Sequence, residues 1–292
     1  MVGDKRDALL RAQADGDIRA FRAALRAAQL HIGLDDPTVK RMREVLKEAD
    51  WAVRVCGQNP SMSKIVEVVR RLNELDLGPL KWKQPILASS RAKLAAFRAS
   101  GLRSEDEEQR KRACDSLRAM GEAAAQHAAE VCTLFTDTLE VRLAAGNCVK
   151  HMGQGGALAC VECLTHPNPT SRKAACEALG AMKEGASHAA AVSGVLQDAE
   201  VDVRKVAFLA FEEFGPEGAM YADAVAVGLE DGDPGIRRVA CKALAVMGRG
   251  ALQHAGAVAE RLEHDPDPEV KIAARNACKR FAALGWTGSV PA

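Results

Sequence analysis

A basic residue recurs six times in the last two-thirds of this 292-residue chain, and a fixed pattern of residues recurs with it. The six anchors are Arg110, Arg142, Arg172, Arg204, Arg237 and Lys271. The steps between successive anchors are 32, 30, 32, 33 and 34 residues. A slightly varying period with a constant internal pattern predicts a stack of repeated units, not one globular fold around a single core.

Three apolar positions follow every anchor at constant offsets. Offset 3 is always alanine: Ala113, Ala145, Ala175, Ala207, Ala240 and Ala274. Offset 7 is Leu117, Val149, Leu179, Phe211, Leu244 and Cys278, and offset 10 is Met120, Met152, Met182, Phe214, Met247 and Phe281. At 3.6 residues per turn these positions share one face of a helix. One unit cannot bury that face alone, so neighbouring units must cover it.

The residues between the anchors predict a second helix in each unit. In the fifth unit a turn at 231–235, rich in Asp, Gly and Pro, precedes a helical stretch at 236–247. Gly248 then interrupts the helix, and a second helical stretch runs over about 253–262. Asp and Pro favour a helix N-terminus and glycine favours a C-terminal cap. Glycine occupies this offset at Gly121, Gly153, Gly215 and Gly248.

Over residues 104–285 the pattern resembles HEAT repeats, specifically the short HEAT-like type of phycobilin lyases and many scaffolds. Turns such as 198–204 and 265–271 carry the resemblance. It implies an all-α solenoid of about five to six helical hairpins. In that family the arginine-bearing helix is the second of each hairpin and lines the concave face. The family also pairs the arginine with a turn aspartate of the same or the next repeat, and three residues are placed for this: Asp198, Asp231 and Asp265.

Two units depart from the pattern. The second has His166 where others have the turn aspartate, and its inter-helix loop is short. The third has Lys183 at the glycine offset. We therefore expect an irregular stack at this point.

The first hundred residues, 1–100, do not follow the repeat and predict a separate helical region. Helical patterns cover 8–30 with a break at 15–17, then 37–55, 62–75 and 85–99. Residues 65–97 weakly resemble the N-terminal helical bundle of transcription elongation factors, through Leu72, Leu75, Leu77, Leu80, Ile86 and Leu94. That family has a glycine where this chain has Leu87, and a stronger basic cluster. The alternative is a cap that covers the open end of the stack. Residues 286–292 are interpreted as a tail.

Composition limits the classes of function. The net charge is +1, which produces no overall field toward nucleic acid or a membrane surface. Aromatic residues make up 4% of the chain, which argues against a catalytic core built on a sheet. Neither an apolar run near 18 residues nor a signal peptide is found in the sequence. We expect a soluble intracellular protein, cytoplasmic in the simplest case, with an organelle left open.

Nine cysteines at irregular positions fit a reducing compartment. Cys160 and Cys163 form a C-x-x-C with His166 three residues on, which leaves a metal or redox site open. The equivalent positions of the first unit are Val131 and Leu134, and no second C-x-x-C completes a zinc site. We favour a packing role, as for Cys114, Cys176 and Cys241 at offset 4. No cofactor or metal is predicted.

Basic residues lie mainly at offsets 1, 5 and 8, opposite the apolar face. The predicted partner-binding residues are Lys111, Lys150, Lys173, Lys205, Arg238 and Lys242. We expect them to line a groove for an acidic peptide or helix of a protein partner. The alternative is an ordinary solvated helix face, since Asp115, Glu177 and Glu212 interrupt the basic residues. Nucleic acid is not an expected partner, because neither a strongly basic domain nor a reading motif is present.

Motifs for catalysis are not found in the sequence. It contains no His-Glu dipeptide, phosphate loop, nucleophile elbow or dinucleotide fingerprint. His127, His188 and His254 recur at one repeat position, with Tyr221 in the fourth unit, which predicts a cap or a hydrogen bond between repeats. The sequence therefore predicts a non-catalytic scaffold or adaptor, a subunit of a larger assembly. A bilin-lyase-type enzyme, implied only by the resemblance, and a transcription-associated module are the alternatives.

Overall fold

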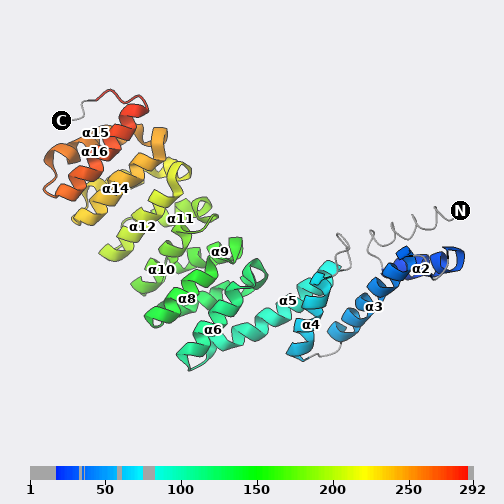
Figure 1. The fold of residues 1–292 in the computed structure, drawn as a ribbon. Coiled ribbons are helices and arrows are strands. Elements are labelled where there is room, and N and C mark those ends of the chain that lie inside the picture. The colour runs from blue at the N-terminus through cyan, green and yellow to red at the C-terminus, as the bar shows by residue number, and fades with distance from the viewer. Residues whose placement is uncertain (1–17, 33–34, 36, 58–60, 75–82, 289–292) are drawn as a thin grey trace. The chain divides into compact units, whose positions relative to one another are not determined.

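The computed structural model describes residues 18–32, 35, 37–57, 61–74 and 83–288 (Figure 1). All regular elements in these residues are α-helices or 3-10 helices. The chain divides into two compact units, residues 1–98 and residues 99–292. In the described residues, no helix is both long enough and apolar enough to cross a membrane.

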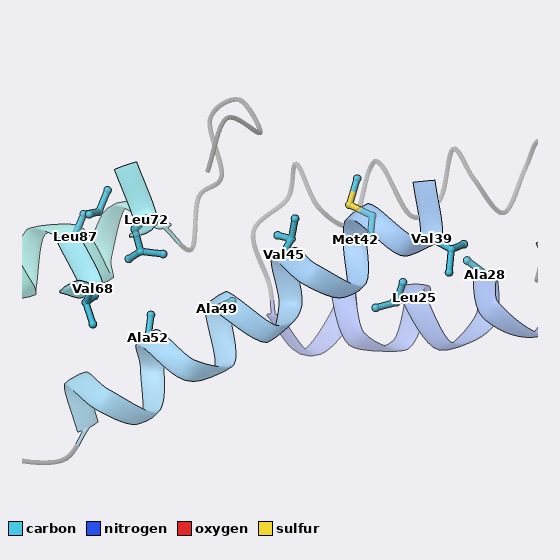
Figure 2. Packing of buried hydrophobic residues seen from close by; sticks show 10 residues of the cluster. All are labelled: Leu25, Ala28, Val39, Met42, Val45, Ala49, Ala52, Val68, Leu72 and Leu87. Carbon is cyan, nitrogen blue, oxygen red and sulfur yellow. The ribbon is translucent and has the colours of Figure 1, made fainter. Parts of the chain in front are cut away.

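The first unit contains the helices α2 (Ile18–Ile32), α3 (Pro37–Gly57), α4 (Met62–Glu74) and most of α5 (Lys83–Ala99). Helix α3 packs against α2 and α4. Buried residues of these three helices and Leu87 of α5 form one apolar cluster (Figure 2): Leu25, Ala28, Val39, Met42, Val45, Ala49, Ala52, Val68, Leu72 and Leu87. The helices predicted at 37–55, 62–75 and 85–99 are thus confirmed to within two residues at each end. Leu75, Leu77 and Leu80 lie outside the described residues.

Helices that carry the anchors form one row in the second unit (Figure 1). They are α6 (Glu107–Arg118), α8 (Leu139–Val149), α10 (Pro169–Gly180), α12 (Val201–Phe214), α14 (Pro234–Met247) and α16 (Pro268–Ala283). Each helix packs against the next in the row. Proline at the first turn and a side-chain cap from the residue before it start several of them, as in α14, where Asp233 accepts from the backbone N–H of Ile236.

The intervening segments form a second row of shorter helices. They are η2 (Gly121–His127), α7 (Ala128–Cys132) and η3 (Thr133–Thr136); α9 (Gly153–Cys163); η4 (Gly185–His188) and α11 (Ala189–Ser193); η5 (Gly215–Tyr221), α13 (Ala222–Ala226) and η6 (Val227–Glu230); η7 (Gly248–His254) and α15 (Ala255–His264). A short 3-10 helix, η1 (Ser100–Arg103), precedes α6. Most helices of this second row therefore combine a 3-10 segment with an α segment, whereas the sequence predicts continuous α-helices there.

The apolar face predicted from the repeat is the core of this unit. All residues at offsets 3 and 7 are buried, and Phe281, Met152 and Met247 at offset 10 are at most 2% exposed. Met120, on the first helix of the row, is half-buried. Small residues at offset 3 let neighbouring helices approach, and larger ones at offset 10 fill the space beyond.

Glycines at the end of the anchor-bearing helices are required by the backbone. Gly121, Gly153, Gly215 and Gly248 have φ values of 56, 56, 54 and 68°, which residues with a side chain rarely adopt. The predicted glycine caps are confirmed at Gly215 and Gly248, whereas the C-caps of α6 and α8 are Ala119 and Lys150 and their glycines begin the next helices. The third unit has no residue with positive φ near Lys183, and its connection runs from Gly180 to Gly185 instead.

Candidate functional site

Four anchor arginines connect successive repeats by the same set of contacts. In each, Nε and Nη2 donate to both carboxylate oxygens of an aspartate in the next turn, and Nη1 donates to two backbone carbonyls of its own turn. The pairs, here called the arginine ladder, are Arg110–Asp137, Arg172–Asp198, Arg204–Asp231 and Arg237–Asp265, at 2.6 to 2.9 Å for their closest contacts. Bidentate geometry of this kind favours a planar guanidinium over an ammonium.

The carboxylates of the ladder are held in their charged form. Hydrogen bonds from Arg110, Arg172 and Arg237 lower the pKa of the paired aspartate, and backbone N–H groups of the turn lower it further. The same contact raises the pKa of Arg237. Asp198, Asp231 and Asp265 are placed as the resemblance implies. Asp137 was missed by sequence reasoning, because it lies five residues before its anchor instead of six.

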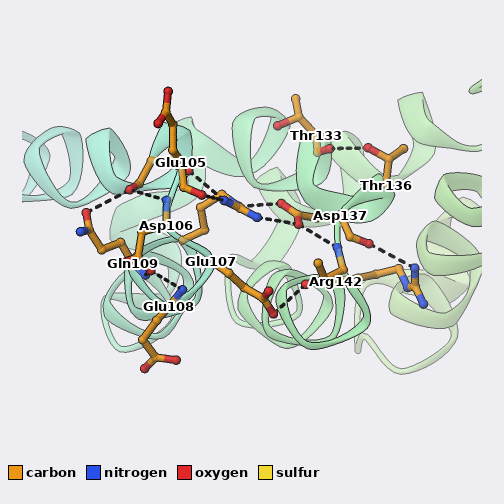
Figure 3. A network of polar contacts seen from close by, with 12 residues as sticks. Glu105, Asp106, Glu107, Glu108, Gln109, Thr133, Thr136, Asp137 and Arg142 are labelled. Carbon is orange, nitrogen blue, oxygen red and sulfur yellow. Dashed lines mark hydrogen bonds and ion pairs between the residues drawn. The ribbon is translucent and has the colours of Figure 1, made fainter.

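The ladder is interrupted at Arg142. The residue in the aspartate position of the following turn is His166, whose Nδ1 accepts from the backbone N–H of Asn168 at 3.0 Å. The ladder aspartate Asp198 makes the same contact with Glu200 N–H, also at 3.0 Å. An imidazole with that acceptor occupied cannot also receive a bidentate guanidinium. Arg142 donates only to the backbone carbonyl of Asp137, at 3.4 Å, and has no carboxylate partner within the described residues (Figure 3).

A groove of about 370 Å³ lies at this interruption, between the N-terminal parts of α8, α10 and α12. Leu139, Arg142 and Leu143 form its α8 wall, and Lys173 and Glu177 its α10 wall. Glu200, Asp202 and Val203 close it on the α12 side. Leu139 and Leu143 are 60% and 55% exposed, which is high for leucines beside one another on a helix. The groove therefore combines an exposed apolar surface with a guanidinium that lacks a counterion.

Two of the predicted partner-binding residues are engaged within the stack. Lys111 contacts Glu108 and Glu140, both at 3.2 Å, and Lys173 contacts Asp202 at 3.2 Å. The hydrogen bond from Lys111 to Glu140 is the main reason that its pKa is raised. The pairs with Glu140 and Asp202 join one anchor-bearing helix to the next, and all three pairs reduce the positive charge that sequence reasoning assigned to this face.

The other four are not in ion pairs with any described residue. Lys150 is half-buried at the end of α8, and Lys242 is exposed on α14. The Nζ of Lys205 lies close to Gly235 at the start of α14. Arg238 has a buried Nε without a hydrogen-bond partner among the described residues. Of the six, only Lys173 lines the groove. A continuous basic surface stays a prediction.

Two of the recurring histidines make hydrogen bonds between hairpins. His188 contacts Gln154 at 3.1 Å and His254 contacts Asp223 at 2.8 Å. His127 makes a local contact with Glu130 at 3.3 Å. None of the three forms a side-chain cap on the helix that follows it. The inter-repeat hydrogen bond is thus confirmed at His188 and His254, and the capping alternative is wrong.

The C-x-x-C pair is part of a thiol cluster inside the second row. Cys160 is fully buried and Cys163 is half-buried, and both lie close to the buried thiol of Cys132 on α7. His166 is exposed and engaged with its own turn. Among the residues described, no group of three histidine, cysteine or acidic side chains is arranged to hold a metal ion. Cys114, Cys176 and Cys241 are fully buried, and burial raises their thiol pKa to about 12.

Comparison with family models decides the nature of the repeat. A model of HEAT repeats matches residues 189–279, and a single HEAT repeat model matches residues 159–186. Residues 159–279 are HEAT repeats. The fold class is all-α, a HEAT-type α-solenoid, as the sequence predicts. The matched models describe HEAT repeats in general, so the bilin-lyase subtype and the elongation-factor resemblance of residues 65–97 stay predictions. No curated protein matches this chain.

Solved structures with similar folds share little sequence with this chain. Kap121p is 14% identical, with 97% of this chain and 38% of Kap121p covered and a TM-score of 0.53. A chain of the structure of Kap95p with RanGDP is 12% identical, with 96% and 45% covered and a TM-score of 0.50. An engineered protein is 17% identical over 97% of this chain and 98% of its own, with a TM-score of 0.42. This chain thus spans less than half of the first two.

Proposed function

We propose that this protein is a non-catalytic scaffold or adaptor that binds a protein partner on the face of its anchor-bearing helices, within a larger assembly. HEAT solenoids are a fold typical of protein-binding scaffolds. The observation that carries the proposal is the groove at the ladder interruption, where Leu139 and Leu143 are more than half exposed beside Arg142. Arginine is among the residues that are enriched at the energetic centres of protein interfaces.

A protein partner fits this groove better than a small substrate would. The groove is open along three helices, and its lining includes two exposed leucines on α8. Small-molecule sites usually enclose most of their ligand. Two of the three recurring histidines, His188 and His254, are engaged in hydrogen bonds that join hairpins. Kap95p, whose structure has a similar fold, is bound to RanGDP, which supports a protein-binding role.

Affinity purification followed by mass spectrometry tests the proposal. Tagged wild-type protein is compared in its source cell with the double variant Leu139→Glu/Leu143→Glu, which changes only exposed side chains and should fold normally. The matched control is Val227→Glu, because Val227 is 56% exposed but lies on η6 in the second row. We expect partners that are retained by the control and lost by the double variant. Equal retention by both would place the binding surface elsewhere.

A further inference from the structure

We infer that Arg142 binds a carboxylate of the partner protein, as each of the four ladder arginines binds an aspartate of this chain. The inferred occupant of the groove is a short segment with one acidic residue next to aliphatic residues. The inference rests on the proposed function of this face and specifies the chemistry of what binds there. It follows from comparing Arg142 with its four repeat equivalents.

The four ladder arginines show which chemical group an arginine at this position of the repeat binds. Arg172 donates from Nε and Nη2 to the two oxygens of Asp198, at 2.6 and 2.8 Å. Arg204 makes the same pair of contacts with Asp231, at 2.9 and 3.2 Å. These two arginines lie on α10 and α12, the other two helices that line the groove. A carboxylate is therefore the group that the local backbone and guanidinium geometry is shaped to receive, and at Arg142 none of the described residues supplies one.

His166 replaces the ladder aspartate without disturbing the turn. Its Nδ1 accepts from the backbone N–H of Asn168, as a ladder aspartate does from its own turn. The carbonyls of His166 and Pro167 still accept from Arg172 at 2.8 and 3.0 Å. The turn and the next ladder pair thus persist, and the change is confined to the missing carboxylate beside Arg142.

The walls of the groove define the rest of the occupant. Leu139 and Leu143 offer an apolar surface next to Arg142, which fits aliphatic side chains on either side of the acidic residue. Across the groove, Lys173 is paired with Asp202, and Glu177 and Glu200 add negative charge. A run of several acidic residues would be repelled by that wall, so a single carboxylate, followed by a basic residue, gives the best charge complementarity.

A pair of peptides tests the carboxylate directly. The full-length protein, labelled at leucine methyl groups, is titrated with acetyl-Leu-Asp-Leu-Lys-amide and with the same peptide carrying Asn for Asp, and the methyl resonances are followed by NMR. We expect the aspartate peptide to shift the resonances of Leu139 and Leu143 and to bind at least about tenfold more tightly, because a bidentate charged hydrogen bond is lost with Asn. Equal affinities, or shifts confined to other leucines, would overturn the inference.

Two substitutions of His166 provide the internal control. His166→Asp supplies a carboxylate from the chain itself, completes the ladder and should abolish the preference for the aspartate peptide, while raising the thermal midpoint. His166→Asn keeps an acceptor for the Asn168 N–H but carries no charge, so it should bind the peptide as the wild type does. Undiminished binding of the aspartate peptide by His166→Asp would contradict the inference.

Failure of the inference is separable from failure of the proposed function. If Leu139→Glu/Leu143→Glu loses its cellular partners but the two peptides bind equally, the face binds proteins without using a carboxylate on Arg142. If the double variant also keeps all its partners, the proposed function of the face fails as well.

Discussion

Arg237 holds Asp265 in a nearly dry contact across a repeat boundary. Its Nε and Nη2 lie 2.8 and 2.9 Å from the two carboxylate oxygens, and the side chains are 10% and 0% exposed. Asp265 also accepts from the backbone N–H of Asp267 at 3.0 Å. One carboxylate therefore orders the start of α16 and ties it to α14. The pair is the most buried in the arginine ladder.

Removing this carboxylate should destabilise the stack strongly. Asp265→Ala leaves the guanidinium of Arg237 buried without a counterion, so we expect a loss of about 3–5 kcal/mol in the free energy of unfolding. Urea titration followed by circular dichroism measures it. The control is Asp202→Ala, since Asp202 is 76% exposed in its contact with Lys173, and should cost less than about 1 kcal/mol. Equal effects of the two changes would show that the ladder is not a structural element.

Stability should fall in acid as the ladder carboxylates take up protons. The pKa values of Asp137, Asp198 and Asp265 are lowered in the folded state. Their stabilising contribution is fully present above the unfolded pKa of about 3.9 and is lost as the pH falls through the lower folded values. Urea midpoints measured between about pH 7 and pH 2 should therefore drop below about pH 4. Asp198→Asn should show a shallower drop, and an unchanged profile would contradict this assignment.

The methionine at offset 10 should contribute as a core residue. Met247 is 2% exposed, so Met247→Ala creates a cavity between hairpins and should cost about 2–5 kcal/mol. Met220 provides a matched control, because it is 82% exposed and its replacement by alanine should have almost no effect. Chemical denaturation of both variants decides the point. If Met247→Ala costs less than about 0.5 kcal/mol, the residues at offset 10 are not part of the core.

A glycine with a positive φ should be costly to replace by a residue with a side chain. Gly248 has φ 68° and ψ −130°, so Gly248→Ala should lose about 1–3 kcal/mol through backbone strain. Gly256 lies inside α15, where an added Cβ would meet nothing within 4 Å. Gly256→Ala should instead gain about 0.4–1 kcal/mol. We expect the thermal midpoint to fall for Gly248→Ala and to rise for Gly256→Ala. Shifts of the same sign would contradict this prediction.

Local patterns allowed much of the fold to be predicted. Helical periodicity at offsets 3, 7 and 10 determined the buried face, because a residue's place on a helix depends only on its spacing. Glycine at offset 11 determined the caps, because the required φ excludes other residues. His166 marked the irregular turn. Asp137 could have been found by allowing a shift of one residue in the turn.

Contacts between repeats were decided only by the tertiary structure. The sequence placed Lys111 and Lys173 on a face for a partner, but stacking brings Glu140 and Asp202 to them from the next helix. It marked His166 as an exception without showing that Arg142 is left beside exposed leucines in a groove. Periodicity specifies which way a side chain points on its own helix. What that side chain meets depends on the distance and rotation between neighbouring helices, which packing of the whole stack sets.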